Sequence, residues 1–185
     1  MKIDLTLQIT PKLAADAQGN EKKALVGHLG THFDVMDKTF PLEDTERPGL
    51  VFDIRGIRDR DIGLPDIDLR QVEPGMFVAF HTGFLAEAGY GTPTYFHQHP
   101  QLSPELIDAL LQAGVSLLGI DAPGIRRGRD HTPTDQRCAD RGVFVIENLC
   151  HLEELLPHGD RFLAHTYPMN YAGVSGLPCR VVAEI

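Results

Sequence analysis

Short apolar segments, separated by polar stretches that contain glycine and proline, run through the whole chain. Polarity alternates over residues 3–9, which indicates a first strand. The run at 76–80 is apolar at every position, as is typical of a strand covered on both faces. Further strands are predicted at 24–28, 50–54, 115–120, 143–146, 161–166 and 179–184.

Two segments carry helix signals. Ser103 before Pro104 is typical of an N-cap and a first helical position, and leucines at helical spacing follow up to a glycine. Residues 135–141 predict a second, shorter helix, whereas 11–23 and 57–75 are polar and predict loops or hairpins. Strands and helices alternate in the middle of the chain and strand pairs stand at both ends. We therefore expect a mixed α/β fold, with residues 1–185 forming a single domain because no linker interrupts them.

Composition narrows the classes of function. The chain of 185 residues has a formal net charge of -9, which disfavours a nucleic-acid partner. The amino-terminal residues lack the apolar core of a signal peptide, and no window is long and apolar enough for a membrane span. The three cysteines are far apart, so they indicate neither a disulfide framework nor a thiolate metal site. We expect a cytoplasmic protein with no membrane or nucleic-acid partner, which acts on a small molecule.

Three good metal ligands, His28, His32 and Asp34, stand within seven residues. Imidazole and carboxylate suit zinc or manganese better than calcium. On one helix, His28 and Asp34 would point about 240° apart, and in a straight strand the two histidines would be about 13 Å apart. The chain must therefore bend between the histidines, and Gly30 is the residue that permits a bend.

These residues resemble the hallmark His-x-Gly-Thr-His-x-Asp-x-Pro-x-His of the "putative cyclase" family, which includes bacterial kynurenine formamidase and isatin hydrolase. The first seven positions match, but Met36 and Lys38 replace the proline and the last histidine. Weaker similarities follow in the same order as in the family. They are VAFHTG at 78–83 (with His81 in place of an arginine), HPQLS at 99–103, GID at 119–121, VIENL at 145–149 and GLPCRV at 176–181.

The resemblance implies a compact domain of the swivelling β/β/α type, usually a homodimer, in which His28, His32 and Asp34 bind a divalent metal. In two-metal members the aspartate bridges to a second ion, which the glutamate of Glu-Asn-Leu and a histidine twelve residues earlier also bind. Here that glutamate is Glu147, and Asp135 stands at the place of the histidine. Asp135 could bind the ion, could cap a helix, or the chain could hold one ion only.

The metal would supply an activated water for hydrolysis of an amide, formamide or cyclic amide. Lys38 takes the position of the family's acid/base histidine, so we expect it to face the metal as a catalytic residue. As a base it would need a pKa far below its usual value of about 10.4, whereas as a cation it could stabilise an oxyanion. Aromatic residues, with Phe33, Phe40, Phe84 and Phe96 as candidates, would form the pocket wall. A rival reading is a family member that keeps the fold but has lost catalysis, and serves as a binding or scaffold protein.

Overall fold

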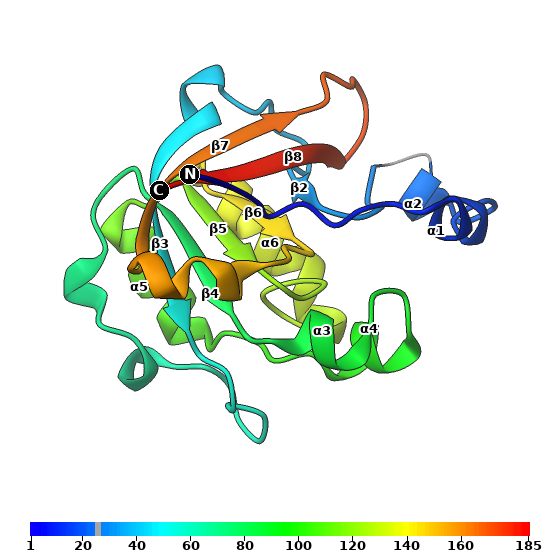
Figure 1. Cartoon of the computed structure of the whole chain (residues 1–185). Helices are drawn as coiled ribbons and strands as arrows, with labels where there is room; N and C mark the ends of the chain where they lie inside the picture. Colours follow the sequence, from blue (N-terminus) through cyan, green and yellow to red (C-terminus); the bar gives the residue numbers. More distant parts are fainter. Residues whose placement is uncertain (25–26) are drawn as a thin grey trace.

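The computed structural model describes residues 1–24 and 27–185, and its strands form one sheet that closes on itself (Figure 1). The order is β1-β8-β2-β6-β5-β4-β3-β7, and β7 also pairs with β8, so seven of these strands complete a barrel. The four strands β3 to β6 are mutually parallel, whereas the other pairings are antiparallel. The strands are β1 (Lys2–Asp4), β2 (His32–Asp34), β3 (Glu46–Asp53), β4 (Phe77–His81), β5 (Leu117–Ile120), β6 (Phe144–Glu147), β7 (Arg161–Pro168) and β8 (Gly176–Glu184).

Helices cover the outside of the barrel and connect its strands. The α-helices are α1 (Pro11–Asp16), α2 (Glu21–Ala24), α3 (Phe84–Ala88), α4 (Pro93–Gln98), α5 (Pro104–Ala113) and α6 (His131–Ala139). Short 3-10 helices are η1 (Leu42–Thr45), η2 (Leu64–Asp66), η3 (Leu69–Gln71), η4 (Gly128–Asp130), η5 (Leu152–Glu154) and η6 (Leu156–His158). Helices α1 and α2 project from one side of the barrel (Figure 1). None of the helices in the described residues is long and apolar enough to cross a membrane.

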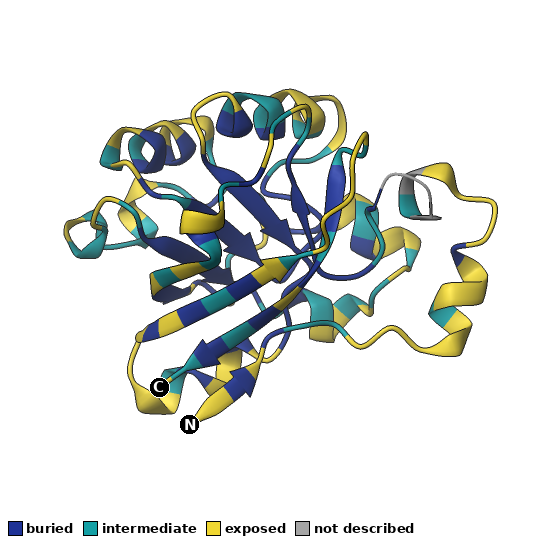
Figure 2. Cartoon of the chain, turned by 90° about the horizontal axis from the view of Figure 1, so that it is seen from above, coloured by how far each residue is buried: buried dark blue, intermediate teal, exposed yellow. Residues whose placement is uncertain are grey.

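Strand β4 separates two hydrophobic clusters, as its unbroken apolar run predicts. Phe77 and Ala79 belong to the cluster inside the barrel, whereas Val78 and Phe80 belong to the one that contains the buried face of α5. Figure 2 shows these central strands buried, and the helices that pack against them buried on one face only. The two ends of the chain lie together, because β1 pairs with β8 and the Met1 ammonium donates to the Ile185 carbonyl at 2.7 Å. The α/β fold predicted from the alternation of elements is confirmed.

Three expectations about local structure need correction. Residues 11–23 hold α1 and α2 rather than a loop, since the Thr10 side chain caps a helix that Pro11 begins. Helix α6 begins at His131, four residues before the predicted start, because a proline in the first turn of a helix is tolerated. The first strand ends at Asp4, although Thr6 forms a further bridge with Leu149. The strand expected at 24–28 falls partly on residues 25–26, which lie outside the described residues.

Candidate metal centre

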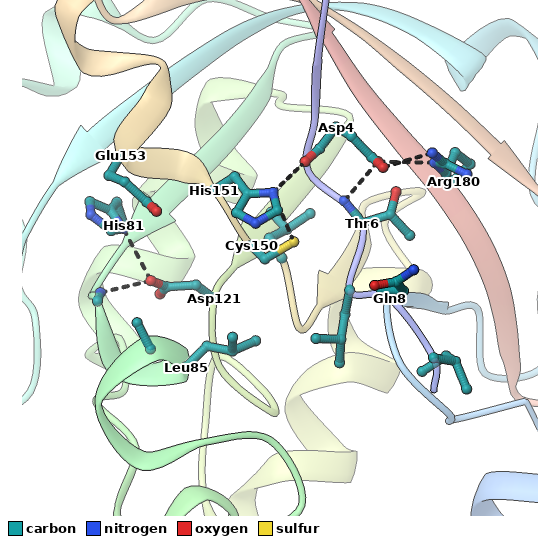
Figure 3. Close-up of a pocket in the computed structure, with 15 residues that line it drawn as sticks. Asp4, Thr6, Gln8, His81, Leu85, Asp121, Cys150, His151, Glu153 and Arg180 are labelled. Atoms are coloured by element: carbon teal, nitrogen blue, oxygen red, sulfur yellow. Dashed lines mark hydrogen bonds and ion pairs between the residues drawn. The ribbon is translucent and has the colours of Figure 1, made fainter. Parts of the chain in front are cut away.

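Two cavities lie near the carboxyl ends of the parallel strands, where ligands of such sheets usually bind. The first, of about 710 Å³, is lined by His81, Asp121, Cys150 and Glu153 among others (Figure 3). The Asp121 carboxylate accepts hydrogen bonds from the Thr82 amide, the Thr82 hydroxyl, the Gly83 amide and His81 Nδ1. Asp121 thus anchors the turn after β4.

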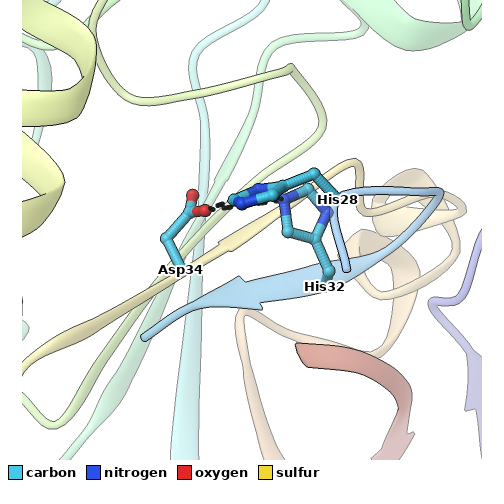
Figure 4. A group of neighbouring side chains, drawn as sticks. All are labelled: His28, His32 and Asp34. Atoms are coloured by element: carbon cyan, nitrogen blue, oxygen red, sulfur yellow. Dashed lines mark hydrogen bonds and ion pairs between the residues drawn. The ribbon is translucent and has the colours of Figure 1, made fainter. Parts of the chain in front are cut away.

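The second cavity, of about 640 Å³, contains the predicted ligands His28, His32 and Asp34. The chain bends sharply before β2, where Gly30 adopts a φ of 71° that glycine tolerates. The bend brings His28 Nδ1 to 2.9 Å from His32 Nε2 and to 3.1 Å from Asp34 Oδ1. Figure 4 shows the two rings and the carboxylate turned toward a common point. The three ligand atoms lie within 4.8 Å of one another, so the geometry expected from the spacing is present.

Hydrogen bonds orient both imidazoles from behind. His32 Nδ1 lies 2.8 Å from the Gly30 carbonyl, which also accepts a hydrogen bond from the Asn148 side-chain amide. His28 Nε2 lies 2.9 Å from the Ser175 hydroxyl. If the outer nitrogen of His32 carries the proton, its inner nitrogen presents a lone pair to the cluster. This arrangement is typical of histidines that bind a metal.

Glu147 and α6 extend this cluster on the far side of Asp34. Glu147 ends β6 directly opposite His32 in the antiparallel pair, and its Oε2 lies 3.5 Å from His32 Nε2. Helix α6 contributes His131 and Asp135, whose Nε2 and Oδ2 lie 3.3 Å apart. A second group of possible ligands thus comprises Asp34, His131, Asp135 and Glu147, all within 4.8 Å.

Sequence reasoning gave Asp135 two roles and gave His131 none. Asp135 lies inside α6, so the alternative that it caps a helix is wrong. His131, the nearest histidine, received no role because it does not stand at the position twelve residues before Glu147. The signal that could have found it is the spacing of four residues from Asp135, which places both side chains on one helix face.

Three carboxylates are buried together in this cluster. Burial and the charge of Asp34 raise the pKa of Asp135, and burial together with Asp34 and Asp135 raises that of Glu147. For Asp34 itself, burial raises the pKa, but hydrogen bonds with His28 and His32 outweigh it and lower the pKa. Asp34 Oδ2, Asp135 Oδ1 and Glu147 Oε1 accept no hydrogen bond within the described part of the chain. Buried oxygens of this kind are costly unless a proton or a cation joins them, so the donor set fits a divalent metal.

Lys38 does not join the cluster. Its ammonium lies 2.8 Å from Asp140 Oδ1 and 3.1 Å from Asp37 Oδ1 at the surface. Hydrogen bonds with Asp140 and Asp37 raise its pKa, opposite to the change that a base would need. Met36 has a φ of 57°, so the chain leaves β2 in a turn rather than in the helical turn that would carry Lys38 back toward Asp34. The expectation that Lys38 faces the metal is therefore wrong.

The wall of the cavity differs from the expected one. Among the four candidate phenylalanines, only Phe96 lines it, together with Tyr90, while Phe33, Phe40 and Phe84 are buried in the protein core. The Lys23 ammonium lies 5.1 Å from the centre of the Phe96 ring and 5.7 Å from that of Tyr90. Other lining residues outside the ligand groups are Asn20, Glu21, Met36, Pro123, Thr132, Asn148 and Ser175. The cavity thus combines a carboxylate-rich floor with an aromatic side.

A family model described as "Putative cyclase" matches residues 3–127. None of the curated proteins compared with the chain matches it. Among solved structures, one described as a potential metal-dependent hydrolase with cyclase activity is 24% identical, with a TM-score of 0.76 over 99% of this chain and 96% of that chain.

Isatin hydrolases share the same architecture. Isatin hydrolase A from Ralstonia solanacearum is 18% identical, with a TM-score of 0.75 over 99% of this chain and 91% of that chain. An isatin hydrolase bound to the product analogue thioisatinate is 17% identical, with a TM-score of 0.77 over 98% and 91%. These identities are low, so the likeness establishes a common fold, and the expected cyclase-like α/β domain is confirmed.

Proposed function

The chain belongs to the "Putative cyclase" family, and from this premise we propose that it is a metal-dependent hydrolase that cleaves an amide, formamide or cyclic amide of a small molecule. One observation carries the proposal: two oriented imidazoles and a buried aspartate converge at the floor of a cavity of about 640 Å³. Cavities of this size accommodate small organic ligands.

His28, His32 and Asp34 would hold the first divalent ion, zinc or manganese, with Glu147 and Asp135 beside it. When bound, such an ion lowers the pKa of a water molecule to about 7 and polarises a carbonyl group. The Gly30 carbonyl and the Ser175 hydroxyl fix the ring orientations. This preorganisation by the chain itself keeps the ligand atoms in place as the substrate enters.

Cleavage of an amide also requires a proton for the leaving nitrogen. Lys38 lies away from the cluster and cannot supply this proton, and we assign the role of proton donor to Tyr90. Its hydroxyl accepts a hydrogen bond from the Gly30 amide at 2.9 Å, while the side chain lines the cavity. Burial raises the pKa of Tyr90, so the phenol is protonated at neutral pH. The proton that it would pass to the leaving nitrogen would be replaced by the one that the attacking water loses.

The aromatic residues on one side of the cavity favour a substrate with a flat ring. Tyr90 and Phe96 pack edge to face with their centroids 6.2 Å apart, and they offer apolar surface beside the ligand cluster. An aryl amide or a ring-fused cyclic amide matches this surface and carries the carbonyl group that a bound ion would polarise.

The proposal is tested by metal analysis and a hydrolysis screen. The purified protein should contain about one or more equivalents of zinc or manganese, and chelation should abolish hydrolysis of aryl formamides and cyclic amides. The His32→Ala variant should lose both metal and activity, whereas His158→Ala, a change at an exposed histidine outside the cavity, should lose neither. Full metal content in His32→Ala would exclude the assigned site. Metal without turnover on any amide would favour the non-catalytic binding protein instead.

A further inference from the structure

The cavity of about 710 Å³ that contains His81 and Asp121 is separate from the metal centre, since no described residue lines both cavities. We propose that this first cavity binds a small planar organic cation of the guanidinium or amidinium type, recognised by Asp121, His81 and Glu153. Figure 3 shows these three side chains on one side of the cavity. The proposed site goes beyond the proposed hydrolysis and needs no metal.

The charges along the first cavity are unbalanced. Arg180 is the only lysine or arginine among the described residues that line it, and Asp4 accepts hydrogen bonds from its Nε at 2.9 Å and its Nη2 at 2.7 Å. Asp121 and Glu153 add two further carboxylates, while the histidines of the lining carry no fixed positive charge. The excess of negative charge attracts a cation and repels an anion.

The inner end of the site is formed by Asp121 and His81, which are both 4% exposed. Four hydrogen bonds already reach the Asp121 carboxylate, so it acts on a ligand through its charge and through the ring that it holds. Because His81 Nδ1 donates to Asp121 at 3.1 Å, the lone pair of a neutral ring lies on Nε2. This nitrogen is buried and has no hydrogen-bond partner in the described part of the chain. An N–H group of a ligand would satisfy it.

The residue at position 81 explains why the site has no fixed positive charge of its own. Residues 78–83 resemble the family's strand followed by Arg-Thr-Gly, with His81 in place of the arginine. An arginine beside Asp121 would bring a guanidinium, whose permanent charge and planar set of donors suit a carboxylate. The imidazole is shorter and lacks both properties. A guanidinium or amidinium ligand would supply them from solution.

Glu153 and His151 offer acceptors at the open side of the cavity, where both side chains are exposed. No described residue forms an ion pair with the Glu153 carboxylate, although Arg55 adds a more distant positive charge. His151 Nδ1 lies 2.9 Å from the Asp4 carbonyl, so a protonated Nδ1 leaves Nε2 as an acceptor. A planar cation with several N–H groups can therefore donate both to the inner end and to the open side.

Apolar side chains cover part of the remaining wall. They belong to Leu7, Ile9, Leu85 and Leu149. Contact with them favours a cation that carries an apolar group over a hydrated inorganic ion. Benzamidine, a flat ring with an amidinium group, combines both properties and is the probe that we choose.

The test is isothermal titration of the full, metal-loaded chain with benzamidine, compared with benzyl alcohol as a neutral ligand of similar size. We expect one benzamidine per chain, bound at least roughly tenfold more tightly than benzyl alcohol, because hydrogen bonds to charged groups are the stronger ones. Absence of benzamidine binding at millimolar concentration, or equal affinity for both ligands, would overturn the proposal.

Two variants locate the ligand. His81→Arg ties a guanidinium to the chain beside Asp121, so benzamidine binding should weaken at least roughly a hundredfold. Glu153→Gln changes an exposed side chain, which keeps the fold, and should weaken binding roughly threefold to tenfold. The matched control Glu154→Gln, at the exposed neighbour outside the cavity, should leave the affinity unchanged. Equal affinities in Glu153→Gln and Glu154→Gln would overturn the assignment, even if His81→Arg failed to fold. No readout depends on turnover, so failure of the hydrolysis screen would leave this result intact.

Discussion

Asp135 should destabilise the metal-free protein and stabilise the metal-bound one. In the absence of an ion, its buried carboxyl group lies within 4.8 Å of those of Asp34 and Glu147. Replacing it by asparagine keeps the shape and removes the charge. We therefore expect Asp135→Asn to raise the stability of the metal-free protein and to reduce the stabilisation gained on adding metal.

The size of this stabilisation follows from the distance between the carboxylates. Two unit charges no more than 4.8 Å apart repel by at least about 3 kcal/mol at an effective dielectric constant of about 20. Burial raises the pKa of Asp135 and of Glu147, so protonation relieves this repulsion in acidic solution and the full repulsion acts only above the raised pKa values. Above those pKa values, removing a repulsion of about 3 kcal/mol corresponds to roughly 6–12 °C in the melting temperature of a chain of this size.

The pH dependence has a defined sign. Burial and the charge of Asp34 raise the folded-state pKa of Asp135. Burial and the charges of Asp34 and Asp135 raise the folded-state pKa of Glu147. The folded state then binds more protons than the unfolded one, so the contribution of these two groups to stability is greatest in acidic solution and falls as the pH rises through the raised pKa values. The slope is about 1.4 kcal/mol per pH unit for each proton. Asp34, whose pKa is lowered, acts oppositely but only in more acidic solution.

Thermal unfolding of chelator-treated protein between pH 5 and 8 is the assay. The wild type should lose stability toward pH 8, and Asp135→Asn should be more stable and less dependent on pH. Asp59→Asn, at an exposed position, removes the same charge and should leave both properties unchanged. A metal-free Asp135→Asn variant that is no more stable than the wild type, with an equal pH slope, would refute the electrostatic reasoning.

Three further substitutions probe the cavity and its surroundings. Tyr90→Phe should lower the hydrolysis rate roughly a hundredfold with metal content unchanged. The control is Tyr167→Phe, a change at an exposed tyrosine. A Tyr90→Phe rate equal to that of the control would exclude Tyr90 from the mechanism. Lys38→Met should change kcat less than twofold, because the side chain pairs with surface carboxylates. Lys23→Met should raise KM roughly tenfold for aryl amides that carry a carboxylate and leave KM unchanged for neutral ones. The reason is that Lys23 is the only lysine or arginine among the described residues that line the cavity. Equal effects on both substrates would show that Lys23 binds no anion.

The sequence was sufficient to predict those features that depend on neighbouring residues, such as a buried strand, a bend or the start of a helix. The unbroken apolar run of β4 predicted burial on both faces, and the spacing of His28 and His32 required the bend that Gly30 makes with its positive φ. The Ser103-Pro104 signal marked the start of α5. The equivalent Thr10-Pro11 signal at α1 was overlooked, because α1 has no buried face and therefore no apolar periodicity to support it.

The remaining parts of the site depend on tertiary structure. The direction of Lys38 is set by the left-handed conformation of Met36, and methionine does not signal such a turn. The approach of Glu147 to His32 results from an antiparallel pairing of strands more than a hundred residues apart. Burial of three carboxylates around one point is likewise a property of the barrel, since no stretch of the chain contains all of them.

The case of His131 shows why a comparison by position in the sequence can miss a side chain that reaches the same point in space. Residues 131 and 135 lie one helical turn apart, so their side chains reach the same point from adjacent places on α6. A helix can therefore exchange the two residue types between these positions without moving its axis, provided that the longer side chain finds room. Gly124 and the Arg126 carbonyl supply that room and a hydrogen-bond partner for the ring. An imidazole and a carboxylate therefore still face the buried cluster although position 135 departs from the family pattern, which argues against loss of the site.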